Sequence, residues 1–227
     1  MHIPDGFIDI PTSAGAALLT MAGLGVTLKA AKNKLDERSA PLIGLVAVFI
    51  FAVQMLNFPV AAGTSGHLIG GALAVVLVGP YAATLALTVV LLIQALLFAD
   101  GGLTALGLSI FNMGFVGVWV SYGIFVLIYK LLARFGSNKT SVVIAGAIAA
   151  FISVPAAASA FVFQYWIGGV ATYSTTTVLG AMVGTHILIG IGEGLITGLT
   201  VSAVIASRSD LVYGWKNNNQ KLEIRHA

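Results

Sequence analysis

The chain lacks cysteine and is poor in charge. None of its 227 residues is Cys, which excludes disulfides, thiolate metal sites and cysteine nucleophiles. Only 8% of the residues are charged and 58% are hydrophobic, whereas a soluble domain averages about 25% charged residues. This composition predicts an all-α membrane protein with several crossings. The net charge of +3 does not indicate a nucleic-acid partner, because the basic residues lie in short loops.

No cleavable signal peptide is expected, because the first residues carry no basic segment and the first apolar run is too long for one. Since a crossing needs about 20 apolar residues, we predict seven transmembrane helices. Their approximate ranges are 12–31, 41–57, 67–78, 81–98, 103–132, 141–166 and 178–207. We see no repeat and expect one transmembrane domain over 1–227, with an amino-terminal loop at 1–11 and a tail at 208–227.

The basic residues predict the topology. With seven crossings, every Lys and Arg falls on one side of the membrane, and Asp5, Asp9 and Asp100 fall on the other. The positive-inside rule then places the amino terminus outside and the tail in the cytoplasm. The basic set is Lys29, Lys32, Lys34, Arg38, Lys130, Arg134, Lys139, Arg208, Lys216, Lys221 and Arg225.

The amino terminus contains groups that can chelate a metal ion; its sequence is Met1-His2-Ile3-Pro4-Asp5-Gly6. We expect Met1 to be retained because His2 is bulky, so that a free α-amine stands beside an imidazole. The amine, the His2 amide and the His2 Nδ1 can close two chelate rings on one ion, and such planar nitrogen sites suit Ni(II) and Cu(II). A turn at Pro4–Gly6 is expected to fold this apolar segment back into the mouth of the bundle.

His67 is the expected fourth donor. The predicted topology places it at the outer surface, where it would open the third helix with Thr64 or Ser65 as cap. A helix amino end disfavours imidazolium, so we expect a neutral, ligating ring. The predicted metal site therefore consists of the Met1 amine, the His2 amide, the His2 imidazole and the His67 imidazole.

Other buried polar residues allow more than one interpretation. Glu193 is the only acid inside a predicted span, and it is equally consistent with a partner contact or polar network and with a structural hydrogen-bonded acid. His186 is expected to be an internally satisfied core histidine. Candidate outer partners of the ligands, among which the sequence does not choose, are Gln54, Asn57, Asn112 and Gln164.

Three segments carry a family resemblance: the opening hexapeptide, Gly63-Thr64-Ser65-Gly66-His67, and Ile191-Gly192-Glu193-Gly194-Leu195-Ile196-Thr197. Over essentially its whole length the chain resembles the CbiM/NikM family, the substrate-capture components of cobalt and nickel energy-coupling-factor (ECF) transporters. In that family the amino-terminal amine, His2 and the histidine matching His67 carry the metal.

The resemblance implies a transport subunit and not an enzyme, in the cell membrane of a bacterium or archaeon. It implies Ni(II) or Co(II) as substrate and no bound nucleotide. Its partners would be a transmembrane coupling (T) component, a pair of cytoplasmic ATPases that hydrolyse ATP, and in some cases a small accessory membrane protein. A planar four-nitrogen site favours nickel, and a cobalt-specific subunit is the alternative.

A different class of function is an intramembrane serine protease with Ser65 as nucleophile and His186 as base. Its signal is weak, because short Gly/Ser patterns are common in membrane proteins and Ser65 lies in a connection. A channel fits poorly, since no charged ring or carbonyl filter is evident.

Overall fold

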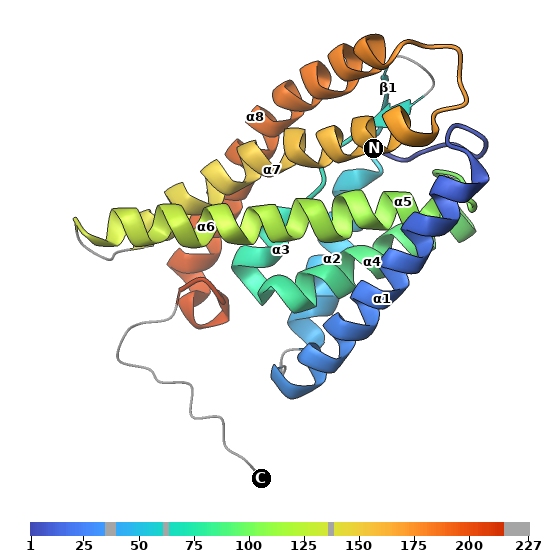
Figure 1. Ribbon diagram of the computed structural model, residues 1–227. Coiled ribbons are helices and arrows are strands. Elements are labelled where there is room, and N and C mark those ends of the chain that lie inside the picture. Colours follow the sequence, from blue (N-terminus) through green and yellow to red (C-terminus); the bar gives the residue numbers. More distant parts are fainter. Residues whose placement is uncertain (35–39, 61–63, 136–138, 216–227) are drawn as a thin grey trace.

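The computed structural model describes residues 1–34, 40–60, 64–135 and 139–215 (Figure 1). This described part contains seven helical segments, so each predicted apolar run is found as a helix. They are α1 (Ile10–Lys34), α2 (Ala40–Gln54), α3 (Gly71–Val78), α4 (Pro80–Leu97), the continuous α5, η3 and α6 (Leu106–Ile110, Phe111–Gly117, Val118–Ala133), α7 (Lys139–Gly168) and α8 (Thr175–Arg208). A short η4 (Ser209–Leu211) follows α8, and most of the predicted tail lies outside the described residues.

Five of these segments are long and apolar enough to cross a membrane: 10–33, 80–97, 106–133, 139–168 and 175–211. The protein is therefore a multi-pass membrane protein. The apolar α2 is shorter, with 15 residues. A crossing by all seven segments and the outward position of the amino terminus remain predictions.

Helix α3 is buried at the centre of the bundle. All eight of its residues are buried, and it packs against α4, α6 and α7 (Figure 1). A helix that is apolar all round is typical of such a position. Eight residues span only about 12 Å, so α3 alone is too short to cross, and the segment 67–70 that leads into it has no helical structure.

The connection between α2 and α3 contains a small hairpin that the sequence did not predict. Strand β1 (Phe58–Val60) pairs antiparallel with β2 (Thr64–Gly66), with Phe58 opposite Gly66 and Val60 opposite Thr64. The Pro and Gly residues of this stretch predicted an irregular connection. Strand β2 ends at Gly66, so the hairpin directly precedes His67 in the chain.

Four loops meet at one end of the bundle: the amino-terminal segment, the β1–β2 hairpin, whose Ser65 accepts from the His2 amide, and the loops at 98–105 and 169–174. The Asp9 amide donates to the Gly168 carbonyl at 2.7 Å, and Ile8 bridges to Gly169. The Thr104 amide donates to Asp5 at 2.8 Å, so the 98–105 loop joins the same end. At the opposite end the Tyr213 amide donates to the Leu77 carbonyl at 3.1 Å. This grouping is the one that alternating crossings predict for the loops without Lys or Arg.

Candidate metal centre

The amino-terminal segment enters the bundle. Phe7 donates its amide hydrogen to the Pro4 carbonyl at 3.3 Å, and Gly6 has φ +74° as the third turn residue. This is the predicted turn, since a type II turn needs a positive φ at that position. Beyond it, Met1 and Ile3 are fully buried, and Gly102 donates to the Ile3 carbonyl at 2.8 Å. The α-amine therefore lies inside the protein.

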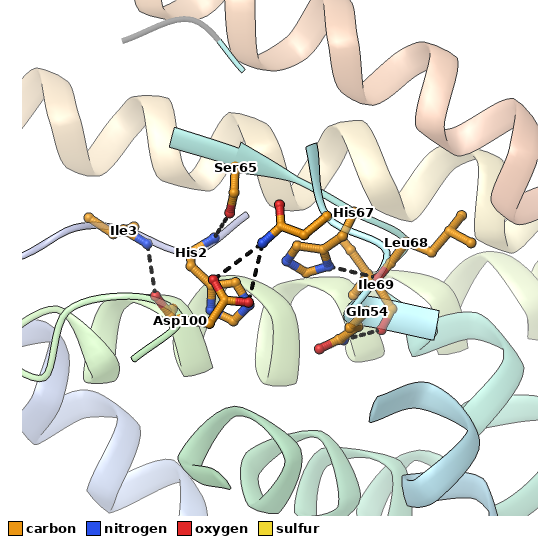
Figure 2. A network of polar contacts seen from close by, with 10 residues as sticks. His2, Ile3, Gln54, Ser65, His67, Leu68, Ile69 and Asp100 are labelled. Atoms are coloured by element: carbon orange, nitrogen blue, oxygen red, sulfur yellow. Dashed lines mark hydrogen bonds and ion pairs between the residues drawn. The ribbon is translucent and has the colours of Figure 1, made fainter. Parts of the chain in front are cut away.

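The structure brings the rings of His2 and His67 next to each other. Their ring centroids are 4.8 Å apart with an interplanar angle of 30°, and Figure 2 shows both rings in one polar network. His67 has no exposed surface and His2 is 5% exposed. The α-amine belongs to Met1, which is bonded directly to His2 and is fully buried. The three predicted metal-binding residues thus share one buried site.

The predicted setting of His67 is wrong. It does not open a helix at the outer surface, because α3 begins four residues later at Gly71. His67 follows β2 in a non-helical segment, so no helix begins at this point of the chain. The prediction starts the helix too early because segment 67–70 and α3 belong to one continuous apolar run, within which composition does not mark where the helix begins.

Both rings are neutral at pH 7 because they are buried. Burial first, and then the charge of the α-amine, lowers the pKa of His2 to about 3. Burial also lowers the pKa of His67 well below its usual value, with further lowering from the amine and from His2. Burial likewise lowers the pKa of the Met1 amine well below its ordinary value, although Asp100 opposes this. Neutral amine and imidazole nitrogens are the forms that bind metal.

Hydrogen bonds fix which nitrogen of His67 is free. Its Nδ1 lies 2.8 Å from the Leu68 carbonyl oxygen, which can only accept, so Nδ1 carries the hydrogen and donates. The Nε2 lone pair is then bare, and among the described residues it has no hydrogen-bond partner. This is the arrangement by which proteins orient a histidine for a metal ion.

Asp100 flanks His2 and was not predicted to be part of the site. Its Oδ2 lies 3.5 Å from the His2 Nε2, and both carboxylate oxygens accept from Asn57 at 3.2 and 3.3 Å. Since His2 is neutral, the contact is not an ion pair. A proton on Nε2 pointing at Asp100 would leave Nδ1 free for a metal. Burial raises the pKa of Asp100, while the amine and Asn57 oppose the shift.

Gly101 lets the 98–105 loop approach His2. Its φ is +91°, and a Cβ placed there would lie 3.0 Å from the His2 Cβ and 3.2 Å from Nδ1. Both the backbone conformation and the space therefore require glycine. In the sequence, the one feature that could have indicated a role for Asp100 in the site is that it is an acid in a predicted loop with no basic residue nearby.

Glu193 and Gln54 hold the backbone just after His67. The Ile69 and Gly70 amides donate to the two carboxylate oxygens of Glu193 at 2.6 and 3.0 Å. From the other side, the Gln54 amide donates to the Ile69 carbonyl at 2.7 Å. Glu193 is thus a hydrogen-bonded acid whose two bonds form a polar network behind His67, so the geometry fits both interpretations of this residue. Because Glu193 lies near the middle of α8, segment 67–70 reaches deep into the bundle.

Two other candidate outer partners lie elsewhere. Asn112 and Gln164 bind each other reciprocally at 2.8 Å in both directions, so their amides are satisfied without any ligand. His186 donates from Nδ1 to the Met182 carbonyl at 2.7 Å, but its Nε2 has no hydrogen-bond partner among the described residues. The expectation of a fully satisfied core histidine is therefore right for one nitrogen only.

The donor set of the site is incomplete without backbone nitrogen. The described residues contain no cluster of three or more His, Cys, Asp or Glu arranged to hold a metal ion. The further nitrogen donors that the chain places next to the His2 ring are the Met1 amine and the His2 amide. Ser65 Oγ accepts the His2 amide hydrogen at 3.3 Å, and no hydrogen bond between described residues joins it to His186.

Comparisons with known proteins identify the relatives of this chain. The sequence profile described as the CbiM "Cobalt uptake substrate-specific transmembrane region" matches residues 2–211. A putative fused nickel transport protein NikMN of Archaeoglobus fulgidus is 41% identical over 212 residues, which are 93% of this chain and 68% of that protein. A putative metal transport protein of Haloquadratum walsbyi is 39% identical over 227 residues, 99% of this chain and 100% of that protein.

A solved structure has the same fold. The crystal structure of a transition metal transporter superposes with a TM-score of 0.82 at 33% sequence identity, covering 91% of this chain and 93% of that one. The curated relatives are named as transport proteins and not as enzymes. The chain therefore belongs to the CbiM/NikM family and is a membrane component of cobalt or nickel transport.

Proposed function

We propose that this protein is the substrate-capture subunit of an ATP-driven ECF-type importer and binds one nickel ion through four nitrogens. The donors are the Met1 amine, the deprotonated His2 amide, the His2 Nδ1 and the His67 Nε2. One observation carries the proposal: two neutral imidazoles lie 4.8 Å apart in a buried site that also holds the α-amine.

The cellular setting belongs to the same proposal. The site opens on the outside of the cell membrane, at the end of the bundle whose predicted loops contain no Lys or Arg. The chain has no glycine-rich nucleotide-binding loop with a lysine. ATP hydrolysis is therefore assigned to a pair of cytoplasmic ATPases that act through a transmembrane coupling subunit, with or without a small accessory membrane protein.

Nickel is favoured over cobalt by the donor set. Four strong-field nitrogens in a plane suit Ni(II), and Ni(II) complexes are in general more stable than those of Co(II) with the same ligands. The relatives divide between the two metals, since the family profile is described by cobalt uptake and the Archaeoglobus relative by nickel transport. Cobalt is therefore the alternative substrate.

Titration of purified protein with nickel chloride tests the proposed function. We expect a one-to-one complex that is yellow and diamagnetic, because planar Ni(II) pairs all its d electrons. Binding should weaken on acidification, since protons compete for the amine, the amide and the imidazoles. A paramagnetic complex with six oxygen-rich ligands, or no binding, would contradict the proposal.

Glu193→Gln should weaken nickel binding without unfolding the protein. The amide has one acceptor oxygen in place of two, so one of the Ile69 and Gly70 amides loses its partner and segment 67–70 loosens. We expect a loss of about 10- to 100-fold in affinity, as is typical when an outer partner of a ligand is removed. Calorimetry would measure the affinity and differential scanning the stability of the metal-free protein.

Ser153→Ala is the matched control for Glu193→Gln. It also removes a buried hydrogen bond, from Ser153 Oγ to the Ala150 carbonyl at 3.2 Å, but both partners of this bond belong to α7 and neither belongs to segment 67–70. It should leave the nickel affinity unchanged. Equal losses of affinity in the two variants would show that Glu193 acts only through overall stability.

Ser65→Ala should change nickel affinity by no more than a few-fold. It removes only the long 3.3 Å acceptor of the His2 amide, and that amide gives up its hydrogen when the metal binds. A serine protease would instead lose all activity. Labelling of the unmodified protein at Ser65 by a fluorophosphonate probe would favour the protease over the transport subunit.

A further inference from the structure

An outer pocket leads from the protein surface to His2. It has a volume of about 340 Å³, and its lining includes His2, Asp5, Ser65 and Asp100. Asp5 is exposed, Asp100 is partly buried and His2 is buried, so the pocket runs from the surface to the edge of the metal site. No Lys or Arg lines it.

The two carboxylates of the pocket have no positive partner among its lining residues. Asp5 binds the Thr104 amide and hydroxyl, and Asp100 binds the Asn57 amide, all of which are neutral donors. The lining therefore holds two acidic side chains and no basic one, a charge distribution that attracts cations.

His2 supplies the observation that points to a ligand. The residue is 95% buried, its Nε2 has no hydrogen-bond partner among the described residues, and this atom lies 3.5 Å from Asp100 Oδ2. At 3.5 Å the contact is too long for a good hydrogen bond. In Figure 2 Asp100 stands directly beside the His2 ring. The pocket thus ends at the residue that is proposed to chelate the metal.

We propose that this outer pocket is a first binding site for the hydrated divalent cation, held by the Asp5 and Asp100 carboxylates before it passes to the nitrogen site. The cation keeps its water shell there, because the remaining carboxylate lone pairs can accept hydrogen bonds from metal-bound water. Its role is kinetic: it raises the concentration of cation beside His2. This inference rests on the proposed function of the four-nitrogen site.

Rapid mixing of the full-length protein with nickel chloride tests the proposal. Asp100→Asn and Asp5→Asn each remove one charge and keep an oxygen acceptor. We expect each to slow association by several-fold and the double variant by about tenfold or more at low ionic strength, within the range known for electrostatic steering. The difference from the unmodified protein should shrink at physiological ionic strength.

Asp9→Asn is the matched control. Asp9 is an acid of the same amino-terminal loop, but it caps α1 through the Thr12 amide at 2.9 Å and does not line the pocket. Asparagine caps a helix equally well. It should leave the association rate within about twofold of the unmodified protein, as expected for a charge outside the focusing pocket.

Two outcomes would overturn the proposal. One is equal slowing by the Asp9 and Asp100 variants, which would mean general attraction without a site. The other is an unchanged association rate with faster dissociation in Asp100→Asn, which would mean that Asp100 only orients His2. Absence of nickel binding in the unmodified protein would instead contradict the four-nitrogen site, so the two failures are distinguishable.

Discussion

One residue added before Met1 is expected to abolish high-affinity nickel binding, although His2 and His67 remain in place. The extension turns the α-amine into an amide and moves the new amine out of the five-membered chelate ring. Met1 is fully buried, so the site also has no room for another residue. We expect a loss well above the 10- to 100-fold that follows removal of an outer partner. Calorimetry with nickel chloride measures it.

A removable extension supplies the control. A short leader that a protease cleaves directly before Met1 should block binding while it is present and restore it after cleavage. The same protein molecule is then compared with and without a free amine. Tight binding by the uncleaved protein would remove the amine from the ligand set and leave His2 and His67 as the only proposed ligands.

His67→Ala is expected to leave a three-nitrogen chelate at the amino terminus. The fourth position would pass to water or another weak donor, so the ligand-field absorption of bound Ni(II) should move to longer wavelength. We expect the affinity to fall by at least about 10- to 100-fold, because a direct ligand matters more than an outer partner. Absorption spectroscopy during titration records both effects.

His186→Gln is the comparison for His67→Ala. His186 is also fully buried, and its Nε2 has no hydrogen-bond partner among the described residues. It does not, however, form a cluster with His2 and His67 that could hold a metal ion in the described part of the chain. Its replacement should leave the spectrum of bound nickel unchanged. If His186→Gln shifts the spectrum and His67→Ala does not, the fourth nitrogen has been assigned to the wrong histidine.

Local features of the chain were sufficient to predict the helices. Each apolar run specifies its own helix because backbone hydrogen bonds within a helix connect residues four apart. The ends of the runs also agree to within a few residues, as in α4, which was predicted at 81–98 and is found at Pro80–Leu97. The third run is the exception, since apolar character extends from His67 but the helix begins at Gly71.

The chelating half of the site was also readable from the sequence. The amine, the amide and the Nδ1 of a second-position histidine are joined by covalent bonds, so their ability to close rings on a metal needs no tertiary contact. The choice of His67 required topology, and it was reached through an incorrect helix start. The structure nevertheless brings this ring to 4.8 Å from His2.

The sequence by itself determined the membrane class, the helical segments and an amino terminus with the chemistry of a metal chelate. Only the tertiary structure decided how deep His67 lies, which residues hold it and where Asp100 stands. Glu193 and Ile69 are 124 positions apart, and Asn57 and Asp100 are 43 apart. Contacts of that separation depend on how the helices pack, and no local pattern of apolar and polar residues encodes them.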